Sequence, residues 1–280
     1  MTENIVGVQP LIDITALTLQ TAFATDKVDG YRPASLLFIA KPESGKTTTI
    51  SKFSLQPYVY FTNEITVKIL VDQILKQIET RQKRFILIPD ILNCVKKSAY
   101  TREPLLQTLK TLVDEGVTNI QTPYKQYQFP TAIKAGLISA ITGSDLYAKQ
   151  GRYSLYNDLQ RMGFLSRMIP FSYQYPIEKF VKIFHYIESG CVDEAEPVKI
   201  PKIVKREKQF HPDPNLFRDL ENISRKLAQF SDSYGFRVQK NLQKLCYANA
   251  MLNGRNAVNI EDVQKVLHLG NWMNFDFNAL

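Results

Sequence analysis

The chain has 280 residues, of which 44% are hydrophobic and 22% are charged, fractions ordinary for a soluble globular protein with one large or two modest domains. Lys and Arg outnumber Asp and Glu by 35 to 27, and this surplus permits a polyanionic partner but also occurs on many solvated surfaces. The three cysteines form no C-x-x-C pair, which argues against a zinc site and a disulfide framework and favours a reducing, cytoplasmic environment. The first twenty residues have no basic segment and no long apolar run, so we expect no signal peptide and no membrane contact.

The first clear element in chain order is an apolar run at residues 36–39, because residues 1–34 give only mixed signals. The run predicts a fully buried strand. It is followed by AKPESGKT, residues 40–47, and by a segment that can begin a helix at Lys46. This is the spacing of the phosphate-binding loop G-x-x-x-x-G-K-[ST], with Ala40 in the place of the first glycine.

The phosphate loop has a physical basis at each position. Backbone N–H groups turn inward between strand and helix, and the start of the helix adds the positive end of its dipole. Gly45 allows the backbone to approach a phosphate, Lys46 reaches the β- and γ-phosphates, and the Thr47 hydroxyl holds Mg²⁺. Ala40 is unfavourable only if that position needs a positive φ. The residues expected to bind ATP are Pro42, Glu43, Ser44, Gly45, Lys46, Thr47 and Thr48. The alternative is a Gly-Lys-Thr turn without a ligand.

Strand and helix patterns then alternate. Strands are expected at residues 58–61, 85–90, 117–120 and 136–142. One helix is expected after residues 62–64, and another after Thr101 with Pro104 in its first turn. This alternation predicts an α/β fold in which helices cover both faces of a parallel sheet.

The composition changes between residues 190 and 214, where Pro and Lys are frequent and apolar periodicity is weak. We interpret residues 191–214 as a linker between an α/β core at 1–190 and a small all-helical domain at 215–280. Its lysines and arginine are more typical of a solvated face than of a binding arm. Helices are expected at about 215–230, at about 238–252 and from Asn259 onward.

A phosphate loop needs a second strand that ends in an acid for Mg²⁺, and a group that positions the attacking water. The segment FILIPD supplies Asp90 as the magnesium ligand. Ile91 follows where a water-positioning Glu is usual, so we expect weak hydrolysis, or Glu115 or another acid in this role. The alternative for Asp90 is a cap of a helix or turn.

The phosphate loop, FILIPD, GLISAIT, GFLSR and the C-terminal helices together resemble the modules of AAA+ ATPases, across about residues 30–270 and in the order that those modules follow. Residues 59–70 and 162–175 resemble two stretches of minichromosome-maintenance-type helicase modules. The second of these carries the arginine finger in that family. The resemblance implies a P-loop core followed by a helical lid.

The resemblance also implies roles for single residues. Thr142 matches sensor 1, Arg167 matches the finger that enters the neighbouring subunit's site, and Arg237 matches sensor 2, the lid arginine that reaches the nucleotide. Arg161 competes with Arg167 for the finger role. Negative charge spreads over the γ-phosphoryl group in the transition state, so cations must surround it. The alternative is that Arg161 and Arg167 form surface salt bridges and that Arg237 is an ordinary arginine at a helix start.

Residues 121–134 interleave aromatic and basic side chains. In related ring ATPases the connection before sensor 1 is a hairpin that faces the central pore. Aromatic side chains there can stack on bases while lysines contact phosphates. The expected nucleic-acid contacts are Tyr124, Lys125, Tyr127 and Lys134. A loop that packs on its own domain is an equal alternative.

The function that follows from the resemblance is that of an AAA+ ATPase. It binds ATP and Mg²⁺ at the subunit interfaces of a homo-oligomeric ring, with a hexamer favoured, and acts on DNA as a helicase, translocase or loader. One alternative is a nucleotide-gated protein remodeller or chaperone. Another is a weakly hydrolysing switch that assembles on DNA. The sequence has no dedicated DNA-binding motif, so we expect a protein partner to supply specificity.

Overall fold

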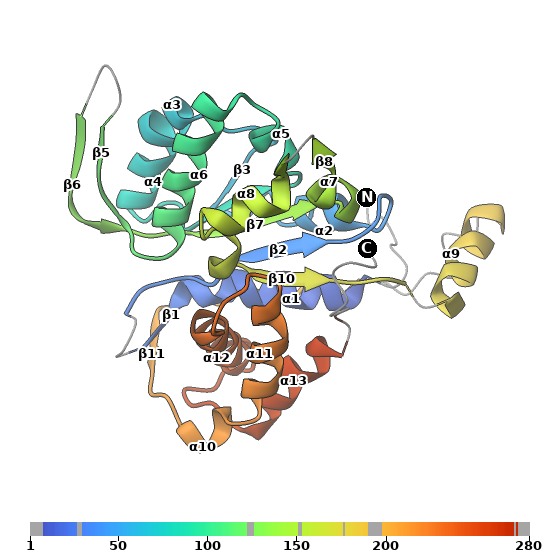
Figure 1. The fold of residues 1–280 in the computed structure, drawn as a ribbon. Coiled ribbons are helices and arrows are strands. Elements are labelled where there is room, and N and C mark those ends of the chain that lie inside the picture. The colour runs from blue at the N-terminus through green and yellow to red at the C-terminus, as the bar shows by residue number, and fades with distance from the viewer. Residues whose placement is uncertain are drawn as a thin grey trace.

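The centre of the molecule is a five-stranded sheet of order β10-β2-β7-β4-β3, with every neighbouring pair parallel (Figure 1). The computed structural model describes residues 8–26, 30–121, 126–150, 153–175, 177–189, 198–271 and 273. The strands of the sheet are β2 (Leu36–Ile39), β3 (Val59–Phe61), β4 (Phe85–Ile88), β7 (Gly136–Ile141) and β10 (Ile169–Ser172). All strands except β3 are buried along their whole length, as expected when layers cover both faces of a parallel sheet. The mixed α/β class with a parallel central sheet is therefore confirmed.

Helices cover both faces of this sheet (Figure 1). On one side lie α6 (Ala99–Val113) and a continuous helix made of α3 (Val67–Ile69), η2 (Leu70–Ile74) and α4 (Leu75–Glu79). The η2 segment is π-helical, with the N–H of Leu75 bonded to the carbonyl of Leu70. Helix α6 begins earlier than expected, so Pro104 lies inside it rather than in its first turn. The shorter elements are η1 (Thr21–Phe23), α2 (Lys46–Ser51), α5 (Leu92–Val95), α7 (Gly143–Tyr147), β8 (Lys149–Gln150), β9 (Tyr153–Ser154), α8 (Leu155–Arg161) and η3 (Leu165–Arg167).

Helix α1 (Gln9–Gln20) lies between the sheet and the C-terminal helices (Figure 1). All its residues from Leu11 to Gln20 are buried except Asp13. A helix that is enclosed on all sides has no single apolar face, so its sequence lacks the helical period. This explains why the apolar residues of the N-terminal segment gave only mixed signals.

The C-terminal part is helical, as expected. Its helices are α10 (Pro214–Phe217), α11 (Leu220–Gln229), α12 (Phe236–Leu252) and α13 (Ile260–Gly270). Helix α13 begins with a capping box, in which the side chains of Asn259 and Asp262 each accept the other's backbone N–H. Asp262 is fully buried and also accepts a hydrogen bond from Asn249 and an ion pair from Arg255.

The segment expected as a linker is packed where the structure describes it. Residues 191–197 lie outside the described residues, but β11 (Lys208–Phe210) pairs in parallel with β1 (Ala24–Asp26). The amide of Gln20 donates to the carbonyl of Val204 and accepts the N–H of the same residue. Residues 198–210 are therefore attached to α1 and β1, so this part of the segment is no free spacer.

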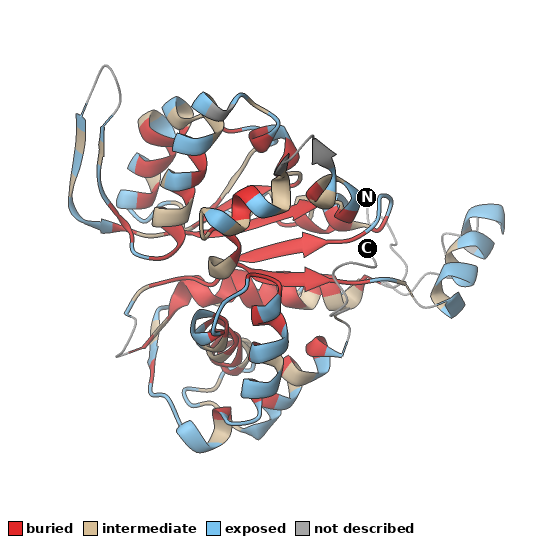
Figure 2. Cartoon of the chain, in the orientation of Figure 1, coloured by how far each residue is buried: buried red, intermediate tan, exposed pale blue. Residues whose placement is uncertain are grey.

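Two elements project from the body. The hairpin of β5 (Val117–Gln121) and β6 (Gln126–Ile133) extends from the start of β7, as expected for the connection before that strand (Figure 1). Helix α9 (Ile177–Ser189) follows β10 and is largely exposed (Figure 2). Its exposed apolar side chains are Ile177, Phe180, Val181, Phe184 and Ile187. Among the described residues, no helix is both long and apolar enough to cross a bilayer.

Candidate functional site

The loop between β2 and α2 turns sharply between the strand and the helix. Glu43 and Gly45 adopt left-handed conformations, with φ of 61° and 81°. Such residues turn successive N–H groups toward one concave surface. Ala40 is absent from the described residues with positive φ, so alanine there causes no backbone strain. A Cβ on Gly45 would lie 3.1 Å from a Val8 methyl, and its backbone conformation is strained for any side chain.

Lys46 is folded into this loop. Its Nζ atom donates to the carbonyls of Ala40 (2.8 Å) and Lys41 (2.6 Å) and to Ser44 Oγ (2.9 Å). The side chain is buried, and burial lowers the pKa of Lys46 to about 8, against the opposing effect of the Asp90 and Asp145 carboxylates. Phosphate oxygens are charged and are stronger acceptors for an ammonium group than these neutral oxygens. The loop therefore holds a cation that a phosphate can take over.

Two tyrosines at the end of β10 hold the phosphate loop in place. The hydroxyls of Tyr173 and Tyr175 both donate to the carbonyl of Ser44, at 2.7 and 2.8 Å. Burial raises the pKa of Tyr175 to about 12 and also raises that of Tyr173, so both hydroxyls keep their protons and act as donors at neutral pH. This contact was not predicted from the sequence. The available signal was their spacing of two residues, which places both side chains on one face of an extended strand.

Asp90 and Thr142 lie at the same edge of the sheet as the phosphate loop. They follow β4 and β7, and β7 lies between β4 and β2. Because all strands are parallel, their carboxyl ends share one edge. Asp90 Oδ1 accepts the N–H of Leu92 at 2.9 Å, which is the turn cap that the alternative interpretation predicted. The negative charge of Asp90 nevertheless raises the pKa of Lys46, so this contact does not remove Asp90 from the site.

The residues at this edge suit a magnesium ion that arrives with a substrate. Among the described residues, no group of three or more His, Cys, Asp or Glu side chains is placed to hold a metal by itself. Mg²⁺ usually binds one or two carboxylates together with substrate phosphates and water. An exposed Thr47 and a half-buried Asp90 fit that arrangement.

Ile91 offers no group to the site. Its side chain is buried in the core and its N–H bonds to the carbonyl of Ala140 at 3.0 Å. Glu115, considered as a substitute for the usual Glu, follows α6 and lies beside Arg167. Arg167 precedes β10, so Glu115 is at the amino edge of the sheet. It cannot position water at the phosphate loop of its own chain.

The arginines expected from the resemblance gather at that amino edge. Arg167 and Arg237 both bind Asp114 Oδ2, with Nε–O distances of 3.2 and 2.9 Å. Arg32, which precedes β2, binds Asp114 Oδ1 at 2.8 Å. Asp114 and the start of β7 are neighbours, since the N–H of Ala135 bonds to the carbonyl of Leu112. Arg237 therefore does not reach the phosphate loop of its own chain, contrary to the expectation that a lid arginine contacts the nucleotide there.

Arg161, Arg167 and Arg237 differ in exposure. The Arg167 side chain is 10% exposed and donates to the carbonyl of Gly163, so it is an ion-pair residue in the single chain. Burial, then the nearby Arg237, lowers the pKa of Arg167, while Asp114 and Glu115 raise it. Arg237 is 44% exposed, and Arg161 is 71% exposed with only a 3.6 Å contact to Asp158. Arg167 and Arg237 share Asp114 at the amino edge of the sheet, whereas Arg161 lies beside Asp158 on α8.

The expected nucleic-acid residues are described only in part. Tyr124 and Lys125 lie outside the described residues. Tyr127 is half-buried and its hydroxyl donates to the Asp72 carboxylate. Lys134 is half-buried, and a Cβ on Gly116 would meet its side-chain carbons at 2.9 Å. Both contacts agree with a hairpin base that packs on its own domain.

The chain matches no family model, and no curated protein matches it. Its function is therefore inferred from the chemistry of its own residues.

Proposed function

We propose that the chain is an ATPase of the AAA+ type, which binds ATP and Mg²⁺ in the phosphate loop and works as a ring of identical subunits. The observation that carries this proposal is the separation of two sets of groups. The phosphate loop, Asp90 and Thr142 lie at the carboxyl edge of the sheet, whereas Arg167 and Arg237 lie at the amino edge. At about 3.3 Å per residue, the four residues of β2 alone separate the two edges by about 13 Å.

This separation supports action between subunits. Cations that stabilise phosphoryl transfer must touch the γ-phosphate, and Arg167 cannot do so in its own chain. A head-to-tail contact brings the amino edge of one subunit onto the carboxyl edge of the next, and such contacts close into rings. We propose that Arg167 is the finger and that Arg237 acts with it on the neighbour's nucleotide. A hexamer is the favoured ring.

In this proposal the parallel sheet and its flanking helices are the P-loop core, and α10 to α13 are the lid. Helix α1 joins them, because it contacts both α2 of the core and α12 of the lid. A change of lid position would therefore be transmitted through α1 to α2 and the phosphate loop. Pro42, Glu43, Ser44, Gly45, Lys46, Thr47 and Thr48 bind the nucleotide, and Asp90 completes the magnesium site with Thr47.

We propose DNA as the substrate of the motor, in a helicase, translocase or loader. The hairpin of β5 and β6 supports this, since its two strands project from the body of the molecule (Figure 1). A protein partner supplies specificity. The deciding experiment is the ATPase rate with and without single- and double-stranded DNA, together with the salt dependence of DNA binding. A rate that DNA leaves unchanged favours a protein remodeller instead.

A weakly hydrolysing switch is a second candidate, and buried Ile91 is the observation that favours it. In that case ATP binding assembles the ring on DNA, and turnover is slower than release of the assembly. Mass measurement with ATP, together with phosphate release, separates the two candidates.

We expect Asp90→Asn to keep ATP binding and to lower magnesium-dependent turnover, because the amide oxygen can still accept the N–H of Leu92 but carries no charge for the metal. Calorimetry measures ATP affinity, and phosphate release at increasing Mg²⁺ measures turnover. Turnover equal to that of the unchanged protein at every Mg²⁺ concentration would remove Asp90 from the site.

We expect Tyr127→Ala to weaken binding of single-stranded DNA by about 1–3 kcal/mol, the value of one stacked base. Tyr127→Phe is the matched control, because it keeps the ring and loses only the bond to Asp72. Fluorescence anisotropy at low salt measures the affinity. Equal losses in both variants would show that Tyr127 only holds the base of the hairpin, and no loss in either would make it irrelevant to DNA.

A further inference from the structure

The proposed hydrolysis needs a group that positions and deprotonates water, and neither position 91 nor position 115 provides one. Ile91 is in the core, and Glu115 is at the amino edge. Two carboxylates act electrostatically on Lys46, namely Asp90 and Asp145. Since Asp90 is assigned to Mg²⁺, Asp145 remains.

Asp145 is placed by the strand beside the phosphate-loop strand. It lies on α7, directly after β7, and β7 pairs with both β2 and β4. The Thr142 hydroxyl donates to Asp145 Oδ2 at 2.6 Å, and Thr142 Oγ1 accepts the N–H of Asp145. These bonds fix the orientation of the carboxylate. A capping interaction alone would give the same bonds, so they do not decide its role.

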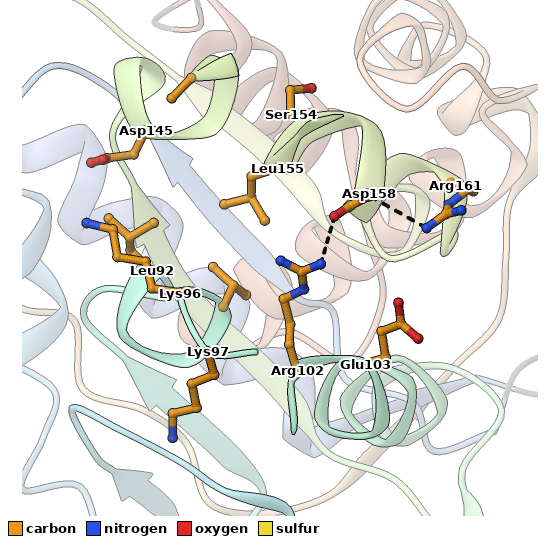
Figure 3. A pocket seen from close by; sticks show the side chains of 12 residues that line it. Leu92, Lys96, Lys97, Arg102, Glu103, Asp145, Ser154, Leu155, Asp158 and Arg161 are labelled. Atoms are coloured by element: carbon orange, nitrogen blue, oxygen red, sulfur yellow. Dashed lines mark hydrogen bonds and ion pairs between the residues drawn. The ribbon is translucent and has the colours of Figure 1, made fainter. Parts of the chain in front are cut away.

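Asp145 is not enclosed by protein, although no residue of the phosphate loop lines the cavity beside it. It lines a cavity of about 510 Å³ between α5, α6, α7 and α8 (Figure 3). At another part of this cavity, Asp158 forms ion pairs with Arg102 (2.9 Å) and Arg161 (3.6 Å). Figure 3 shows the Asp145 carboxylate well apart from this ion-pair cluster. Asp145 therefore lies in the cavity without an arginine partner among the residues drawn.

We propose that Asp145 is the acid that orients and deprotonates the attacking water, an inference that rests on the proposed ATPase function. The water oxygen forms a bond to the γ-phosphorus while the bond from that phosphorus to the β,γ-bridging oxygen breaks. The electron pair of the broken bond goes to ADP, and the proton of the water goes to Asp145 and then to solvent. The products are ADP and inorganic phosphate. Thr142 is a positioning residue that directs the carboxylate through Oδ2.

The test is Asp145→Asn, which keeps an oxygen for the Thr142 hydroxyl and removes the base. We expect phosphate release to fall by about 10²-fold or more, the usual contribution of a general base. ATP affinity, measured by calorimetry, should change less than about threefold, because the contacts of the ground state are kept. Binding of ADP with aluminium fluoride, which mimics the transferring phosphoryl group with its water, should weaken clearly. This binding measurement does not depend on turnover.

Glu103→Gln is the matched control, because Glu103 is an exposed acid that lines the same cavity from α6. It should leave turnover and both affinities unchanged. If Asp145→Asn lowers the melting temperature, rates are compared well below its transition, where the protein is folded.

Each outcome has one meaning. Full turnover in Asp145→Asn with intact ATP binding overturns the role of Asp145 and leaves the proposed function standing. An equal loss of affinity for ATP and for the aluminium fluoride complex also overturns it, since that result shows only a structural cap. If the unchanged protein binds ATP without turnover, hydrolysis itself is wrong and so is the role of Asp145. If the unchanged protein binds no ATP, the proposed function fails.

Discussion

Replacing Arg167 with alanine is expected to reduce ATP hydrolysis by the assembled ring on the order of 10³–10⁵-fold, the value of a finger arginine in well-studied cases. ATP binding by each subunit should remain, because Arg167 lies at the edge of the sheet opposite the phosphate loop. The fold should also remain, since Asp114 keeps Arg32 and Arg237 as partners. Arg161→Ala tests the competing candidate, because it removes an equal charge from an exposed side chain nearby in sequence. The drop is smaller if baseline turnover is low.

Mixing two inactive variants tests the geometry. An Arg167→Ala subunit has an intact phosphate loop, and a Lys46→Ala subunit has an intact finger. Some interfaces in a mixed ring join a good loop to a good finger, so activity should partly return. An arginine that only stabilises its own chain through Asp114 gives no such rescue. Absence of rescue, with mixed rings confirmed by mass measurement, would move Arg167 out of the active site and leave Arg161 or Arg237 as candidates.

Replacing Lys46 with alanine is expected to abolish ATP binding. The change removes the buried ammonium that binds three oxygens of the phosphate loop, and with it the cation that phosphates would take over. Lys41→Ala is the matched control, since Lys41 is an exposed lysine of the same loop. Lys41→Ala should keep most of the affinity for ATP. That result would show that the loss of one positive charge is not enough to explain the effect of Lys46→Ala. Calorimetry measures both variants.

The Lys46 variant also tests the loop itself. The fold should survive, because the contacts of Tyr173 and Tyr175 with Ser44 do not involve Lys46. The melting temperature of the variant checks this. A folded Lys46→Ala variant that binds ATP as well as the unchanged protein would contradict the phosphate-loop assignment. It would leave the Gly-Lys-Thr turn as a structural feature only.

Several elements were predictable because their signals are local. The apolar runs of β2, β4 and β7 are enclosed on both faces, and each strand lies within the residues predicted for it. The loop from Ala40 to Thr47 was predictable from the spacing of its residues and from a glycine that can adopt a positive φ, and both features lie within eight consecutive residues. Helix α13 has one apolar face and could be read from its period, and the first half of α12 shows the same spacing at Val238, Leu242 and Leu245. Helix α1 could not, since it is enclosed on all sides.

The sequence by itself determined the α/β class and the place of the loop from Ala40 to Thr47 between a buried strand and a helix, because these depend on neighbouring residues and their periods. Only the tertiary structure decided which groups meet. The parallel sheet places Thr142 and Asp145 beside the phosphate loop, and moves Glu115, Arg167 and Arg237 to the opposite edge. The hydroxyls that hold Ser44 come from a strand 129 and 131 residues further along the chain. Contacts between such distant segments depend on strand order, which no local pattern encodes.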